Sequence, residues 1–176
     1  MALLKIARMG HPVLLARAEP VSDPHDASVR RLIDDMIETV EDARGVGLAA
    51  PQVHVGLRIF VYRVPEQRST GPDDPPLAVQ ALINPRITPL GEELVLRVEG
   101  CLSIPGLRGA VPRHVRVGYA GFDRNGIPVS GEARGFLANV LQHENDHLDG
   151  ILYPMRMTDM TRFSFEDEFA RFGLPA

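Results

Sequence analysis

Two histidines four positions apart, His143 and His147, stand with a glutamate, Glu144, in a segment that is typical of a helix. Side chains at positions i and i+4 lie on one face of a helix, so both imidazoles can bind one metal ion. Glu144 lies one step round the helix from His143, close enough to take a proton from a metal-bound water. This H-E-x-x-H pattern indicates a metal-dependent hydrolase.

A catalytic metal site of this kind needs a third protein ligand and one open position. One protease pattern places a histidine six residues after the second one, but Tyr153 stands there. Another class takes a glutamate from a downstream helix, which could be Glu166 or Glu168, although both belong to an acidic stretch typical of a solvated face. Cys101 is the only cysteine and can be a small buried residue. It is nevertheless the favoured third ligand, because a thiolate forms readily beside a dication and two imidazoles.

Length and composition limit the classes of protein to which the chain can belong. A chain of 176 residues fits one domain, residues 1–176, that buries a core without disulfides. A net charge of −4 gives no electrostatic footprint for direct nucleic-acid binding. No apolar run reaches the roughly 20 residues that cross a membrane, and the first residues lack the pattern of a signal peptide. We therefore expect a cytoplasmic enzyme with no membrane partner.

The elements that must position these residues follow from the apolar spacing. A helix is predicted over residues 27–43, because apolar residues recur there at i, i+3, i+4, i+7, i+8 and i+11 and form one stripe for the core. Asp26 or Ser28 can cap its start. Gly45 is expected to supply the left-handed residue just beyond its end.

A second helix, which carries the two histidines, is predicted over residues 135–148 and is followed by Asp149 and Gly150. At about 100° per residue, Asn139 falls on the shoulder of the face that carries the histidines, whereas Asn145 points away from it. Asn139 is therefore expected to make one flank of the pocket more polar.

Between the helices the chain has the pattern of strands separated by turns and by one exposed loop at residues 65–76. The strands are predicted at residues 57–64, 77–83, 93–98 and 114–122. Turns are predicted at Asn84-Pro85, at residues 123–126 and at Pro128. A shorter helix is predicted over about residues 161–171. Strands in the middle with helices at either end indicate an α+β fold.

Three segments resemble the motifs of the peptide deformylase family, in its order and at about its spacing. They are G-V-G-L-A-A-P-Q at residues 45–52, E-G-C-L-S at residues 99–103 and Q-H-E-N-D-H-L at residues 142–148. H-E-x-x-H alone is shared by many metalloproteases, but the combination of three motifs is specific, and the resemblance covers nearly the whole chain. It implies mixed or antiparallel sheets packed around a central H-E-x-x-H helix, with an N-terminal helix.

The resemblance also implies a metal centre and a substrate. Cys101, His143 and His147 bind the metal in similar enzymes, with water as the fourth ligand. Ferrous iron is implied as the physiological metal, although zinc, nickel or cobalt can occupy such sites. The implied substrate is a nascent chain that begins with N-formylmethionine, met near the ribosome exit. The products are formate and a free N-terminus.

The expected reaction begins when metal-bound hydroxide attacks the formyl carbon. Glu144 accepts the proton as general base and then passes it to the leaving amine as general acid. By resemblance, the backbone N–H of Leu102 and the side-chain amide of Gln52 stabilise the negative charge on the formyl oxygen. A catalytically silent metal-binding or ribosome-binding relative is the alternative, but pure binding needs neither Glu144 nor Gln52.

The substrate is expected to add as an extra strand beside glycines that leave room for its backbone, namely Gly45, Gly47 and Gly100. The apolar slot for methionine is expected to consist of Val46, Phe136, Val140 and the ring of His143. Arg108 either contacts the peptide backbone, as its position implies, or is a surface charge. Asn145 departs from the apolar residue more common in similar enzymes, and we expect it to change packing without loss of activity.

Overall fold

The computed structural model describes residues 2–173. Its helices are α1 (Ala27–Asp42), α2 (Gly135–Leu148) and α3 (Glu166–Phe172), with short 3-10 turns η1 (Pro12–Leu14), η2 (Ala50–Val53), η3 (Glu66–Arg68), η4 (Tyr153–Arg156) and η5 (Met160–Arg162). Its strands are β1 (Gly47–Ala49), β2 (Ile59–Val64), β3 (Leu77–Pro89), β4 (Leu94–Cys101), β5 (Ile104–His114), β6 (Arg116–Phe122), β7 (Pro128–Arg134) and β8 (Phe163–Phe165). The predicted α+β class is confirmed.

Helix α1 forms where its apolar stripe predicts it. The side chain of Asp26 accepts a hydrogen bond from the N–H of Ser28 and caps the first turn. The end of the helix differs from the prediction, because Arg44, with φ of 53°, takes the left-handed conformation expected for Gly45. A Cβ at Gly45 would lie 2.9 Å from side-chain atoms of both Leu102 and Val40, so this glycine is needed for close packing instead.

The larger sheet has the strand order β1-β2-β3-β6-β7, and all its neighbouring strands are antiparallel. Strand β2 is buried on both faces. Ile59 and Val61 pack with the apolar stripe of α1 on one side, and Phe60 and Tyr62 pack with α2 on the other. This double burial explains why β2 has an almost continuous apolar sequence with only weak alternation.

The predicted turn at Asn84-Pro85 is wrong, because β3 continues through both residues to Pro89. The pairing register with β6 shifts between Ile83 and Arg86, and Asn84 has φ of 50°. The side chain of Asn84 exchanges two hydrogen bonds of 2.8 Å with the backbone of Val21. These turn-forming residues therefore make a bulge inside a long strand. Pro128 likewise begins strand β7 and is not a turn.

The smaller sheet has the order β4-β5-β8. Strand β5 falls between the predicted strands, and β8 replaces the first part of the helix predicted over about residues 161–171. Strand β8 pairs with β5 through residues 163–165, and α3 follows directly. A separate apolar cluster joins Ile104 of β5 to Leu14 and Tyr153 outside this sheet.

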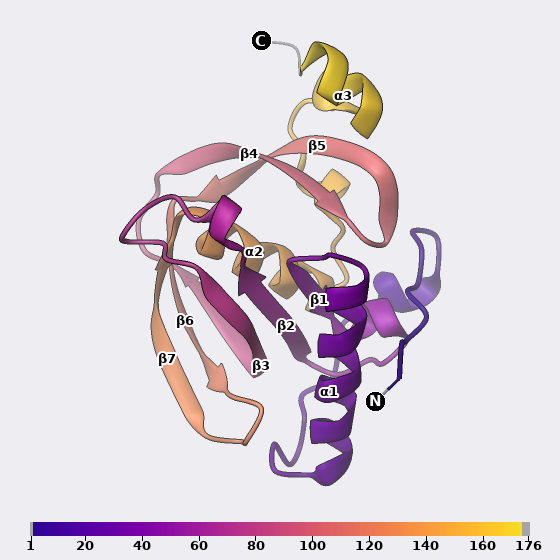
Figure 1. Ribbon diagram of the computed structural model, residues 1–176, viewed down its shortest axis with the longest axis vertical. Coiled ribbons are helices and arrows are strands. Elements are labelled where there is room, and N and C mark those ends of the chain that lie inside the picture. The colour runs from indigo at the N-terminus through magenta and orange to yellow at the C-terminus, as the bar shows by residue number, and fades with distance from the viewer. Residues whose placement is uncertain (1, 174–176) are drawn as a thin grey trace.

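Helix α2 runs through the middle of the molecule, between the larger sheet and the β4–β5 hairpin (Figure 1). It packs most closely on β2 and β1 and also contacts β5. Side chains of α2 can therefore contact residues from both sheets. None of the helices in the described residues is long and apolar enough to cross a membrane.

Candidate metal centre and active site

The H-E-x-x-H residues lie within α2 and are almost completely withdrawn from solvent. The exposed fractions of His143, Glu144 and His147 are 9%, 3% and 1%. The two imidazole rings lie edge to face with their centroids 5.0 Å apart, as the i, i+4 spacing on one helix face requires. Both rings are therefore held by a rigid element from the middle of the fold.

Cys101, the last residue of β4, brings its sulfur to this pair. The Sγ atom lies 3.2 Å from Nε2 of His147 and accepts a hydrogen bond of 3.4 Å from the N–H of Ser103. Cys101, His143 and His147 each offer a ligand atom within 4.8 Å of the others, and no other such group occurs among residues 2–173. Donor atoms around a tetrahedral transition-metal ion lie roughly 3–4 Å apart, so the three residues fit one such ion.

The charge state of the sulfur suits the same role. Burial raises the pKa of the Cys101 thiol, but the neighbouring His147 and His143 outweigh it and hold that pKa well below its usual range. A thiolate is the form of cysteine that binds metals. One thiolate and two imidazoles suit a transition metal better than calcium or magnesium, which prefer oxygen ligands.

A buried network that the sequence analysis did not assign holds His143 in place. Glu99 lies 2.7 Å from Nδ1 of His143, and Arg113 donates to both oxygens of Glu99, at 2.7 and 3.0 Å. Arg113 also donates to Asp146 at 2.6 Å, and Asp146 accepts from Arg156 at 2.7 Å. Because Nδ1 of His143 is occupied by Glu99, Nε2 is the nitrogen left for a metal. The position of Glu99 two residues before Cys101 is the only signal of this role in the sequence.

The carboxylate of Glu144 occupies the space above Gly47. A Cβ built at Gly47 would lie 2.1 Å from Oε1 of Glu144, so any larger residue would displace the carboxylate. The other oxygen, Oε2, is buried without a hydrogen-bond partner among the described residues. Burial is the main cause that raises the pKa of Glu144 to about 7, and a dication beside it would lower that pKa. The carboxylate lines the pocket, where it can accept a proton from a bound water.

The two residues expected to stabilise the oxyanion both line the same pocket. Gln52 is 1% exposed, and its side-chain oxygen accepts from the N–H of Ala49 at 2.8 Å. The amide nitrogen faces the hairpin, where it donates to Oγ of Ser103 at 3.1 Å and lies 3.4 Å from Sγ of Cys101. Leu102 follows Cys101 at the turn between β4 and β5 and is half-buried.

The pocket has a volume of about 380 Å³, and its walls include the residues expected to form the methionine slot, namely Val46, Phe136, Val140 and His143. Asn139 also lines it, as the helical spacing predicts, and its Oδ1 atom has no partner among the described residues. Asn145 does not line it, and its side chain contacts Arg58 and Asp149 on the other side of α2.

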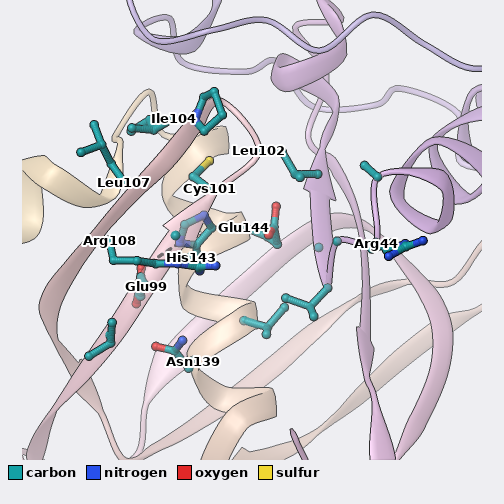
Figure 2. A pocket seen from close by; sticks show the side chains of 18 of the residues that line it. Arg44, Glu99, Cys101, Leu102, Ile104, Leu107, Arg108, Asn139, His143 and Glu144 are labelled. Atoms are coloured by element: carbon teal, nitrogen blue, oxygen red, sulfur yellow. Dashed lines mark hydrogen bonds and ion pairs between the residues drawn. The ribbon is translucent and has the colours of Figure 1, made fainter. Parts of the chain in front are cut away.

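Arg108 lies along the wall formed by the hairpin, next to Cys101 and His143 (Figure 2). A Cβ at Gly100 would lie 2.2 Å from its guanidinium, so Gly100 makes room for Arg108, just as Gly47 makes room for Glu144. Arg108 also pairs with Glu166 of α3. Glu166 is therefore occupied as a surface ion-pair partner, and Glu168 is exposed, which leaves Cys101 as the third donor.

A thiolate and two imidazoles beside a buried carboxylate, in a pocket with an amide aimed at the sulfur, are the features of a metal-dependent hydrolase. Comparison with known proteins narrows the class. The model of the polypeptide deformylase family matches residues 3–163. The chain therefore belongs to the polypeptide deformylase family, whose members depend on a metal.

Individual relatives agree with this assignment. Peptide deformylase 2 of Ralstonia nicotianae is 46% identical over 162 residues, which are 92% of this chain and 91% of that protein. Peptide deformylase 1 of Bordetella pertussis is 47% identical over 162 residues and 92% of both chains. The crystal structure of peptide deformylase from Ehrlichia chaffeensis in complex with actinonin has a TM-score of 0.83, with 37% identity and 92% of both chains covered. The peptide deformylase of Acinetobacter baumannii with Met-Ala-Ser bound has a TM-score of 0.80 at 36% identity, over 88% of this chain and 98% of that chain.

Proposed function

We propose that the pocket around Cys101, His143, Glu144 and His147 carries out the deformylation that defines the family. The chain is a hydrolase that removes the N-formyl group from the N-terminal formylmethionine of newly made polypeptides and releases formate. The observation that supports this pocket as the site is the meeting of three metal-binding side chains from β4 and α2 with a buried carboxylate.

Cys101, His143 and His147 hold the metal in this proposal, and ferrous iron is the proposed physiological ion, with zinc, nickel or cobalt able to replace it. When bound, the ion acts as a Lewis acid and lowers the pKa of water at the site. Glu99 orients His143 for this role by occupying its Nδ1 atom at 2.7 Å. Arg113 in turn holds Glu99.

Glu144 takes the proton from the attacking water and passes it to the leaving amine. The side-chain amide of Gln52 and the backbone N–H of Leu102 stabilise the negative charge that develops on the formyl oxygen, and loss of one such donor typically costs about 10²–10³ in rate. Gln52 is suited to this task because its contact with Ala49 fixes the amide before the substrate arrives.

The methionine side chain occupies the apolar part of the pocket, against Val46, Phe136 and Val140. The peptide backbone continues as an added strand beside residues 45–47 and Gly100, with Arg108 as a contact. The relative from Acinetobacter baumannii has Met-Ala-Ser bound, and a tripeptide of this kind is the product expected here. We place the reaction in the cytoplasm, near the ribosome exit, and assign it to a single domain of residues 1–176.

Formate release from a formyl-Met tripeptide by the iron-loaded, anaerobic protein tests the reaction. Glu144→Ala should lower kcat by at least 10³-fold while the metal stays bound, and the exposed Glu132→Ala should change neither. Failure of the wild-type protein to release formate would reject the assignment. Metal content distinguishes Cys101 from Glu166 as the third ligand. Cys101→Ala should lose the ion, whereas Glu166→Ala should keep it.

A further inference from the structure

Arginines surround the mouth of the pocket. Arg44 and Arg108 lie at opposite walls, one at the end of α1 and the other on the hairpin of the smaller sheet (Figure 2). A third, Arg68 in η3, also lines the pocket, with its guanidinium 5.4 Å from the centre of the Phe136 ring. We refer to Arg44, Arg68 and Arg108 as the arginine rim.

Negative charge does not balance the rim. Among the acidic residues that line the pocket, Glu99 is buried and paired with Arg113, and Glu144 lies beside the metal-binding side chains. Only Glu166 stands at the mouth, where it pairs with Arg108. Within residues 2–173 no acidic side chain forms an ion pair with Arg44 or Arg68, and both are exposed. The rim is therefore positive although the whole chain carries a net charge of −4.

The backbone holds Arg44 at this place in a conformation that glycine adopts more easily. Its φ of 53° lies in the left-handed region, which a residue with a side chain adopts only at a steric cost. Its N–H donates to the carbonyl of Glu41 at 3.0 Å, within the turn that ends α1. Residues in costly backbone conformations are concentrated at functional sites. Arg44 therefore stands where glycine would suit the turn better but would offer no charge.

Arg68 belongs to the loop of residues 65–76, which was predicted to be exposed and which contacts the pocket wall. Asp74 in this loop is 2% exposed and accepts hydrogen bonds from the N–H groups of Phe136, at 2.7 Å, and Leu137, at 3.1 Å. These contacts cap the start of α2 and tie the loop to the pocket wall. Arg68 is consequently kept over Phe136, the residue proposed to contact the methionine side chain.

We propose that the arginine rim gives the enzyme a preference for nascent chains with acidic side chains in the first few residues after formylmethionine. The inference rests on the proposed function, since it takes the methionine side chain to lie against Phe136 and Val140. The chain that follows the methionine then leaves the pocket between Arg44 and Arg108. Guanidinium groups pair with carboxylates through two hydrogen bonds, and a positive rim also speeds the encounter with an acidic peptide.

Three C-terminally amidated peptides of equal length test this preference: formyl-Met-Ala-Glu-Glu-amide, formyl-Met-Ala-Gln-Gln-amide and formyl-Met-Ala-Lys-Lys-amide. Amidation removes the terminal carboxylate, so only the side chains differ in charge. We expect kcat/KM to fall in the order Glu, Gln, Lys, by roughly twofold to fivefold per step at low salt, the size typical of exposed ion pairs. The difference should lie mainly in KM and should shrink as salt rises towards 1 M, because the screening length falls to about 3 Å.

Variants then assign the preference to the rim. Arg44→Gln combined with Arg68→Gln should bring the ratio of the Glu to the Lys peptide close to one. Glu166→Gln should raise that ratio, because it removes the one carboxylate at the mouth. Arg30→Gln is the matched control, since Arg30 is exposed on α1 and does not line the pocket, and it should keep the wild-type ratio.

Equal kcat/KM for the three peptides in the wild-type enzyme would overturn the inference alone. So would an acidic preference that persists in the Arg44→Gln, Arg68→Gln protein. No formate from any of the three peptides would overturn the proposed function and the inference with it. The two failures are therefore distinguishable in one set of measurements.

Discussion

Nδ1 of His143 lies 2.7 Å from Glu99, and the two side chains are 10% and 2% exposed. This contact fixes which ring nitrogen faces the pocket, and Arg113 fixes the glutamate in turn. The proposed metal ligand is thus oriented by a buried charged network before any metal binds. Removing such an outer contact typically costs 10–100-fold in metal affinity or activity.

Glu99→Gln should therefore release the metal to a chelator about 10–100-fold more readily than the wild-type protein. Glu132→Gln is the control, because Glu132 also pairs with an arginine, Arg116, but at the surface with 61% of its side chain exposed. Metal retention against increasing chelator is the measurement. Equal retention in Glu99→Gln and Glu132→Gln would contradict a positioning role for Glu99.

Acid should destabilise the fold through the same glutamate. Burial opposes the ionisation of Glu99, but its hydrogen bonds with His143 and Arg113 outweigh that effect and lower its pKa from 4.5 to about 2. A depressed pKa in the folded state gives stability that is present above pH 4.5 and is lost as pH falls towards 2. Urea unfolding of the metal-free protein between pH 6 and 2 should show this loss, and Glu99→Gln should show a smaller pH dependence across that window. An unchanged slope in the variant would rule out Glu99 as its source.

Gly47→Ala should reduce kcat by at least about 10²-fold with little change in metal content. The added Cβ would lie 2.1 Å from Oε1 of Glu144, so the carboxylate must leave its place above the glycine, and catalytic groups tolerate little displacement. Gly56→Ala is the matched control, since a Cβ there meets nothing within 4 Å. Formate release together with metal analysis distinguishes this effect from loss of the metal. A fully active Gly47→Ala enzyme would show that Glu144 need not occupy this position.

Arg44→Gly should stabilise the protein by about 1 kcal/mol, because glycine adopts the left-handed conformation at φ of 53° without steric cost. Thermal or urea unfolding measures the gain. The same variant should lose part of the preference for acidic peptides, so stability and selectivity should change in opposite directions. Destabilisation by Arg44→Gly would mean that the side chain contributes more to the folded state than its backbone costs.

The helices could be predicted because their apolar spacing reflects burial of one face. The three metal-binding residues could be proposed because they lie in short motifs whose characteristic residues are adjacent in the sequence. Strand β5 could not, because Pro105, Gly106, Gly109 and Pro112 interrupt the alternation that marks a strand, and pairing with β4 and β8 decides its conformation.

Other features depend on contacts between distant segments. Glu99 meets Arg113 only after the hairpin has formed, and no local pattern encodes that pair. The residue after α1 in the left-handed conformation is Arg44, because Gly45 is needed for close packing against Val40 and Leu102. Local rules identify which residue type suits a turn, but the tertiary structure decides which of two neighbours adopts it.

The register of β4 on β5 shifts between Glu99 and Cys101, immediately before the proposed sulfur ligand. Side chains alternate across a strand, so a slip of one residue would replace the sulfur with Gly100 or Leu102 and would turn Glu99 away from His143. An ion held by Cys101 and by the histidines of α2 would bind only the correctly aligned hairpin. Its binding energy would therefore stabilise the correct register relative to every misaligned one. Metal binding would then select the correct register of β4 on β5, in addition to being required for the reaction.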